Sequence, residues 1–524
     1  MPVVAGEQSS TSAAENQSEH TYGQILKSSA IIGGSTVLKV GIGIVRTKIM
    51  ALLLGPAGFG LAGLYMSIIT LTQSIAGMGI NSSGVRQIAE ATGSGDQDRV
   101  ARTTIVLRRT SVVLGLLGAI LLVLFSKQVS IVTFGDAKQR RAVCLISLAV
   151  LFLLISAGQG ALIQGMRRIA DLAKMNVIGA LSGLVISIPV VYFMREKGIA
   201  ISLVLVAATT IITSWWYGRK IRIHFMQLTY SQIRQEAAGL LKLGIAFMVS
   251  GLLAPGVAYF VRVMLLHKEG LAATGIYQSA WTLGGLYVGF ILQAMGADFY
   301  PRLSAVANLN GECNRLVNEQ AHIGLLIAGP GVLATLTFAP VVIALFYSAK
   351  FGGAVEVLRW VCLGATMQVL TWPMGFIIVA KSRQNLFLLS EILWAISAVG
   401  LAWICVTWWG LKGAGIAFFL SYLAHGIIVY PITQRLSGFR WSLENRHTGL
   451  VILGLIALVF CGFYVLPVLW AALVGALAAA LCSFYSIRVL SKLVPAHKIS
   501  PPIRRILVGL RIAPSGRDAS HPSL

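Results

Sequence analysis

The chain has little charge: Asp, Glu, Lys and Arg together make up 11% of its 524 residues, whereas 56% are apolar. A soluble globular chain is nearer a quarter charged, so this composition excludes a soluble enzyme and indicates a polytopic membrane protein. Acidic residues are scarce, 18 against 42 Lys and Arg, which leaves a formal charge of +24. Because nucleic-acid-binding proteins also have such a balance, its meaning depends on where the basic residues lie.

Cysteine is scarce too, and its six copies have no metal-binding pattern. No CxxC pair and no Cys/His cluster with ligand spacing occurs, which excludes a secreted disulfide scaffold and predicts neither a metal nor another cofactor. We interpret the thiols as small buried hydrophobes. A Walker A motif is also missing, so ATP hydrolysis by this chain is not expected.

Long apolar stretches dominate the sequence. A bilayer-spanning helix needs about 20 mostly apolar residues. Fourteen stretches approach this length: 25–54, 59–80, 110–126, 142–163, 175–194, 198–217, 240–266, 272–297, 321–347, 355–380, 386–408, 413–434, 448–466 and 468–487. They predict an all-α polytopic membrane protein. Residues 1–24 lack the basic-then-apolar order of a signal peptide, and we expect a disordered cytoplasmic tail there.

The basic residues between these stretches predict the orientation. Connections on the side of the N-terminus hold about three times as many Lys and Arg as the opposite ones. By the positive-inside rule, both termini are expected in the cytoplasm. Most of the positive charge then reflects the orientation of the chain in the membrane, and nucleic acid is not an expected partner. The outward loops are no longer than about fifteen residues, which argues against a membrane-embedded glycan polymerase or ligase.

Short sequence motifs recur about 215 residues apart, in the same order along the chain. Examples are Leu26-Lys27 with Leu241-Lys242, Val45-Arg46 with Val261-Arg262, Gly63–Ser67 with Gly275–Ser279, and Gly198–Ala200 with Gly415–Ala417. The repeat unit contains six stretches, and because six is even, both copies have the same orientation. Parallel repeats about an axis along the membrane normal are typical of transporters that work by alternating access.

This repeat predicts the domain organisation. The expected parts are a tail at 1–24, an N-terminal six-helix bundle at 25–220, a cytoplasmic linker at 221–237, a C-terminal six-helix bundle at 238–436, an additional transmembrane hairpin at 448–490, and a basic cytoplasmic tail at 491–524. In the last part, apolar residues around Ile506 share a face opposite Arg504 and Arg505. We expect a short amphipathic helix there on the anionic inner leaflet.

Three cations inside the stretches are the candidate substrate-binding residues. Lys39 lies near the middle of the first stretch, and Arg46 follows two turns later on the same face. A cation at mid-bilayer costs at least about 2.5–3.5 kcal/mol, so it normally faces a bundle interior or a wet cavity. We interpret Lys39, Arg46 and the repeat counterpart Arg262 as a cationic wall for an anionic substrate. Snorkelling or internal ion pairing is the alternative.

One carboxylate in the stretches has no cation at helical spacing. Glu391 lies about two turns into the eleventh stretch, and the repeat places Asn176 at the equivalent position. An unpaired intramembrane carboxylate is a candidate for coupling to protons or another cation. A hydrogen-bonded structural role is the alternative. His425, in the next stretch, is expected to be a satisfied core residue.

Helix-breaking residues at bilayer depth are candidate hinges. Pro255 and Gly256 interrupt the seventh stretch, and Pro373 lies in the tenth. Such residues are tolerated in a membrane where they line a cavity or bend a helix. Close packing of small residues is the alternative.

A family resemblance rests on the first hairpin. The stretch Leu38–Arg46, continued by Leu54-Gly-Pro-Ala-Gly-Phe-Gly-Leu-Ala-Gly63, closely resembles the first hairpin of bacterial O-antigen translocases and lipid III (enterobacterial common antigen) flippases. Gln164–Arg167 and Tyr300–Ser304 lie where that family has loop motifs, and the resemblance covers about residues 25–436. The family belongs to the multidrug/oligosaccharidyl-lipid/polysaccharide (MOP) exporter superfamily.

The resemblance implies a fold of two six-helix bundles in a V around a central cavity. It implies a flippase that carries undecaprenyl-pyrophosphate-linked oligosaccharides, such as O-antigen repeat units, to the periplasmic leaflet of the bacterial inner membrane. Lys39, Arg46 and Arg262 would then contact the pyrophosphate or acidic sugars. Besides that substrate and membrane lipids, a polysaccharide polymerase and a chain-length regulator are candidate partners.

The chain departs from this family by its hairpin and tail after residue 448, because close relatives usually have twelve spans. Fourteen spans are similar to the lipid II flippase branch of the superfamily. The alternatives are therefore a lipid II-type flippase or a drug/cation antiporter of the same fold. An antiporter would favour carboxylates rather than cations in its cavity.

Overall fold

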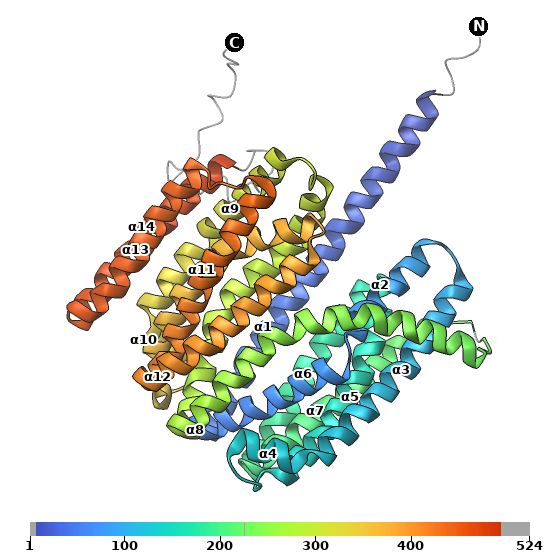
Figure 1. Cartoon of the computed structure of the whole chain (residues 1–524), viewed down its shortest axis with the longest axis horizontal. Coiled ribbons are helices and arrows are strands. Elements are labelled where there is room, and N and C mark those ends of the chain that lie inside the picture. The colour runs from blue at the N-terminus through green and yellow to red at the C-terminus, as the bar shows by residue number, and fades with distance from the viewer. Residues whose placement is uncertain (1–6, 225, 494–524) are drawn as a thin grey trace. The chain divides into compact units, whose positions relative to one another are not determined.

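The computed structural model describes residues 7–224 and 226–493, and within these residues it contains helices and no strand (Figure 1). The α-helices are α1 Glu7–Ala76, α2 Ile80–Gly93, α3 Gln97–Leu124, α4 Ser126–Phe134, α5 Arg140–Gly165, α6 Ile169–Met194, α7 Lys197–Gly218, α8 Tyr230–Ala305, α9 Asn310–Thr337, α10 Ala339–Phe346, α11 Ala354–Ala380, α12 Gln384–Ser437, α13 Leu443–Val465 and α14 Val468–Leu493. One 3-10 turn, η1, covers Ala349–Phe351. The all-α expectation is confirmed.

The three longest helices each bend at one glycine. Gly55 in α1 (φ 64°, ψ −175°), Gly270 in α8 (φ 86°, ψ −179°) and Gly410 in α12 (φ 55°, ψ −138°) are the non-helical residues inside them. Glycine reaches positive φ without the steric cost that a Cβ imposes, so the chain turns there within a single residue. Each of these helices therefore has two arms, one before and one after its glycine.

The arms account for the number of predicted spans. Ten helices in the described ranges are long and apolar enough to cross a membrane, and α8 and α12 are among them. Helices α1, α8 and α12 carry two predicted stretches each, and eight other helices carry one each. All fourteen predicted stretches therefore lie mainly on helices.

The structure differs from the prediction at the N-terminal end and does not describe the C-terminal end. Helix α1 begins at Glu7, although a disordered tail was predicted up to residue 24; the Ala, Glu and Gln in that segment favour a helix. Residues 494–524, with the predicted amphipathic helix, lie outside the described part of the chain.

The internal repeat is visible in the backbone. Residues with positive φ recur in three pairs at a spacing of 215: Gly55 with Gly270, Arg167 (φ 54°) with Ser382 (φ 57°), and Arg195 (φ 51°, ψ −131°) with Gly410 (φ 55°, ψ −138°). A non-glycine residue with positive φ is uncommon, so their recurrence at one spacing is informative. The same turns therefore stand at equivalent positions of the two halves.

The chain divides into two compact units, residues 1–259 and 260–524. Residues 230–259 of α8 belong to unit 1, where Leu240 is buried in a core with Leu107 and Leu162. Gly79 and Gly244 approach so closely that a Cβ on Gly244 would clash with the carbonyl oxygen of Met78. This packing places the boundary inside α8, beyond the predicted linker at 221–237.

In unit 2, the additional hairpin of α13 and α14 packs on α9 (Figure 1). Gly329 of α9 makes room for this contact, since a Cβ there would lie 2.9 Å from Ile452 of α13 and 3.4 Å from Cys482 of α14. The hairpin is therefore packed against the second repeat through the α9 surface.

A polar network ties the start of α13 to α9. Nδ2 of Asn318 donates to the carbonyl oxygen of Arg440 at 3.0 Å, and its Oδ1 accepts from the backbone N–H of Ser442 at 2.8 Å. Oδ1 also accepts from Nδ2 of Asn445 at 2.9 Å. One turn earlier, Asn314 exchanges hydrogen bonds with Ser437 at 2.8 and 2.7 Å. These bonds satisfy backbone groups where α12 ends and α13 begins.

Candidate functional site

Lys39 and Arg46 line one cavity inside unit 1. The cavity has a volume of about 590 Å³ and is formed by α1, α2, α5, α6 and α7. Its polar lining, apart from the two cations, consists of amides and hydroxyls: Asn81, Ser156, Gln164, Asn176, Thr210 and Thr213. None of the described residues around the cavity is acidic. The predicted pair of cations on one face is thus found on the wall of a polar cavity.

Helix geometry sets the spacing of the two cations. Seven residues separate them, which is a rise of about 10 Å along α1. Gly43, between them, also lines the cavity. Arg46 lies against Gly183 of α6, where an added Cβ would be 3.2 Å from its Nη1 atom. Gly183 therefore leaves the room that the Arg46 guanidinium occupies.

Both cations lack a counter-ion among the described residues. Across residues 7–224 and 226–493, neither the Lys39 ammonium nor the Arg46 guanidinium has a hydrogen bond or ion pair; Lys39 is exposed and Arg46 is half-buried. A guanidinium offers a planar fork of donors that fits phosphate, and an ammonium acts as a compact point charge. The surrounding amides and hydroxyls can donate and accept hydrogen bonds. This arrangement suits an anionic, hydroxyl-rich ligand.

Sequence reasoning missed part of the polar lining. Asn81, Ser156, Thr210 and Thr213 were not singled out, although they are polar residues in or beside apolar stretches. Asn176 entered only as the repeat counterpart of Glu391. Polar side chains at bilayer depth usually face an interior or a cavity, and this signal was available.

Arg262, the repeat counterpart of Arg46, has a different environment. It is 7% exposed in unit 2, and its Nε donates to Oε1 of Gln278 at 2.6 Å. The amide of Gln278 in turn donates to Thr282 at 3.1 Å. The guanidinium is therefore hydrogen-bonded to a neutral amide inside its own unit. Its role in binding a substrate stays a prediction.

Glu391 has a partner that the sequence analysis did not expect. Its Oε1 lies 3.7 Å from Nε2 of His425, which stands on the other arm of α12. Neither ring nitrogen of His425 forms a hydrogen bond within the described part of the chain, so this histidine is not the satisfied core residue that was predicted. Trp394 and Tyr422 flank the imidazole, with ring centroids at 6.4 and 6.3 Å. The partner was missed because only cations at helical spacing were considered, whereas His425 comes close through the bend at Gly410.

The candidate hinges lie within continuous helix. Helix α8 passes through Pro255 and Gly256, and α11 passes through Pro373, without leaving helical geometry. Proline removes one backbone hydrogen bond but keeps a φ that a helix accepts. The boundary between the two units falls just after Pro255, between Tyr259 and Phe260.

Comparisons with known proteins agree on one group. The profile of a family described as "Polysaccharide biosynthesis protein" matches residues 25–307, just over half of the chain. The chain is similar to the lipid III flippase of Escherichia coli (strain K12), with 24% identity over 411 residues that cover 76% of this chain and 96% of that protein. The lipid III flippase of Shigella flexneri matches to the same extent.

Solved structures show the same fold. The chain is similar to an inward-facing MATE family transporter of the MOP superfamily, with a TM-score of 0.64, 17% identity, and coverage of 76% of this chain and 95% of that chain. It is also similar to the lipid II flippase MurJ in an inward closed conformation, with a TM-score of 0.64, 14% identity, and coverage of 88% and 99%. The resemblance predicted from the first hairpin is thereby confirmed.

Proposed function

The chain belongs to the polysaccharide biosynthesis protein family, and from this premise we propose that it is a flippase for a lipid-linked oligosaccharide. It moves the glycan across the membrane by alternating access and forms or breaks no covalent bond. The relatives named lipid III flippase, together with the lipid II flippase among the solved structures, support this class of transporter.

The observation that carries the proposal is the pair of unpaired cations in the cavity of unit 1. Lys39 and Arg46 bind the pyrophosphate that joins the glycan to its undecaprenyl carrier, or acidic sugars next to it. The amides and hydroxyls around them bind sugar hydroxyls. Arg262 contributes only if a substrate displaces Gln278 from its guanidinium.

The orientation follows the distribution of basic residues. Both termini lie in the cytoplasm of a bacterium, the protein spans the inner membrane, and the substrate is picked up from the cytoplasmic leaflet. A polysaccharide polymerase and a chain-length regulator are proposed partners on the strength of the family alone.

Coupling and movement involve other residues. Glu391 is the proposed site where a proton or another cation binds, because it is a carboxylate at bilayer depth whose Oε1 lies 3.7 Å from Nε2 of His425. Pro255 and Gly256 are the proposed hinge between the halves, since the division into two compact units falls just after them. Pro373 is a second, lesser hinge within unit 2.

Two alternatives stay within the superfamily. A lipid II-type flippase is favoured by the 88% of this chain that the lipid II flippase structure covers. A drug/cation antiporter needs negative charge to hold a cation, and the described lining of the unit 1 cavity has none.

The test replaces each cavity cation by an amide. In Lys39→Gln and Arg46→Gln, lipid-linked repeat units should accumulate in the inner leaflet while the amount of protein in the membrane is unchanged. Lys48→Gln is the matched control, because Lys48 lies on the same helix but does not line the cavity. Surface polysaccharide at the control level in both cavity variants would refute the proposed anion site.

A further inference from the structure

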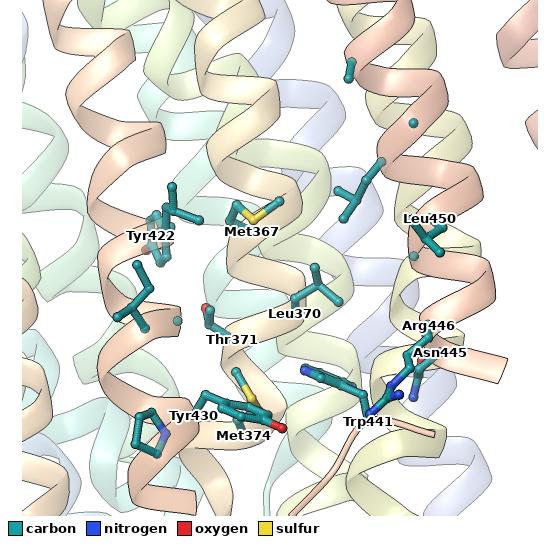
Figure 2. A pocket seen from close by; sticks show the side chains of 18 residues that line it. Met367, Leu370, Thr371, Met374, Tyr422, Tyr430, Trp441, Asn445, Arg446 and Leu450 are labelled. Carbon is teal, nitrogen blue, oxygen red and sulfur yellow. The ribbon is translucent and has the colours of Figure 1, made fainter. Parts of the chain in front are cut away.

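A second cavity lies inside unit 2, between α11, the second arm of α12, and α13. Its volume is about 1020 Å³ (Figure 2). Over most of its length the walls are apolar, with Met367 and Leu370 on α11, Ile427 on α12, and Leu450 and Leu453 on α13. It is separate from the cation-lined cavity of unit 1, and none of the residues proposed for transport lines it. We call it the hairpin groove, because α13 of the additional hairpin forms one wall.

One end of the hairpin groove is polar. Figure 2 shows Tyr430, Trp441, Asn445 and Arg446 gathered at this end, with Met367 and Leu450 farther along. Asn445 is 4% exposed and donates to Asn318 on α9, which fixes the first turn of α13. Arg446, the next residue, is exposed, and its guanidinium has no hydrogen bond or ion pair to any described residue. The groove thus combines an apolar channel with an unpaired cation at its mouth.

The polar end is the basic end of unit 2. Lys381, which follows α11, donates to the carbonyl oxygen of Ala307 after α8, so these two connections meet there. Arg435 and Arg440 belong to the same end, at the junction of α12 and α13. Tryptophan and tyrosine are enriched where a membrane protein meets the lipid headgroups. Arg446, Trp441 and Tyr430 therefore lie at headgroup level of the leaflet that the basic residues mark.

The length of the groove matches one leaflet. From Arg446 to Ala457, the lining residues of α13 span a rise of about 16 Å. Half of a hydrocarbon core of about 30 Å is about 15 Å. Two glycines on this wall keep the channel open, because a Cβ on Gly449 or Gly454 would meet no atom within 4 Å. The space is thus as deep as the acyl chains of a lipid in a single leaflet.

We propose that the hairpin groove holds a phospholipid of the cytoplasmic leaflet that has an anionic headgroup, of the phosphatidylglycerol class. Its phosphate is bound by Arg446 through charge-assisted hydrogen bonds, and its glycerol region lies beside Trp441 and Tyr430. Its acyl chains fill the apolar channel between α12 and α13. The lipid is a resident ligand rather than the transported substrate.

The test measures lipid retention by the full chain. Purified protein is incubated with equimolar phosphatidylglycerol and phosphatidylethanolamine of identical acyl chains, and bound lipid is counted by native mass spectrometry. Wild type should retain phosphatidylglycerol in excess, and Arg446→Gln should lose roughly fivefold of that preference, the effect of one basic residue at an anionic surface. Arg440→Gln is the matched control, since Arg440 is an exposed arginine of the same end that does not line the groove.

A second variant tests the apolar channel without changing charge. Gly454→Leu places a side chain in the open space and should lower retention of both lipids, with the headgroup preference of the remainder unchanged. An equal preference for phosphatidylglycerol in Arg446→Gln and Arg440→Gln would overturn the proposal. Retention of both lipids by Gly454→Leu at the wild-type level would also overturn it. Displacement of phosphatidylglycerol by equimolar undecaprenyl phosphate would also overturn it, since the groove would then belong to the carrier lipid. None of these readouts depends on transport.

Discussion

Removing the Asn318 side chain tests how the additional hairpin is held. The change Asn318→Ala deletes three side-chain hydrogen bonds, to Arg440, Ser442 and Asn445, which connect α9 to the start of α13. A further bond from Nδ2 of Asn445 to the backbone carbonyl oxygen of Asn318, at 2.8 Å, remains. The bond from Asn318 to the carbonyl oxygen of Asn314 stays within α9 and affects the junction little. The variant therefore weakens the polar network at the start of α13 and leaves the apolar packing of the hairpin in place.

The expected magnitude follows from these three bonds. Each contributes a net 0.5–1.5 kcal/mol or so, which gives about 2–4 kcal/mol for the set. For a unit of this size, 1 kcal/mol corresponds to about 2–4 °C, so the midpoint of thermal unfolding should fall by roughly 5–10 °C. Amide hydrogen exchange should become faster around Ser442 and Asn445, because their backbone region loses its anchor while the core of α9 keeps its own.

The assay is thermal unfolding in detergent, combined with hydrogen exchange resolved by peptide. Asn308→Ala serves as the control, because Asn308 is an exposed asparagine without a side-chain hydrogen bond in the described part of the chain. If both variants unfold within 1 °C or so of each other and exchange alike, the network does not stabilise the junction. The hairpin would then be held by the α9 packing around Gly329 and by the bonds that do not involve the Asn318 side chain.

Three further predictions concern the two units. Gly183→Ala should displace Arg46 and reduce glycan export at normal protein level, whereas Gly41→Ala should not, because an added Cβ there meets no atom within 4 Å and Gly41 does not line the cavity. Equal export by the two variants would show that Arg46 can move without loss. Gly244→Ala should cost about 1–3 kcal/mol through its clash with Met78, while the open site Gly251→Ala should be neutral or stabilising in the same thermal assay. In proteoliposomes, Glu391→Gln should abolish the response of transport to a proton or sodium gradient, and an intact response would remove Glu391 from coupling. If His425→Gln has the same effect, the pair acts together.

The sequence predicts well what depends on local pattern. Apolar runs locate the membrane helices, because each span must be apolar along its own length. The spacing of Lys39 and Arg46 places them on one helix face, and the structure adds a cavity at that face. The repeat is predicted from paired motifs such as Val45-Arg46 and Val261-Arg262. In the structure, turns with positive φ recur at equivalent positions of the two halves.

The remaining features depend on contacts between distant segments. Glu391 meets His425 only because α12 bends at Gly410, and no spacing along one helix indicates this. The boundary inside α8 depends on how Leu240 and Gly244 pack against other helices of unit 1. A composition change at 221–237 gives no measure of that packing, so the predicted linker and the observed boundary differ.

The single-glycine bends have a practical consequence for mapping this protein in a cell. At Gly55, Gly270 and Gly410 two membrane helices follow each other with no loop between them. A reporter enzyme, an epitope or a protease site inserted there would have to be accommodated inside a helical turn. It would disrupt the helices whose orientation it is meant to measure. The connection 135–139 between α4 and α5 offers irregular backbone instead. An insertion there is the place to establish experimentally which side of the membrane this connection faces.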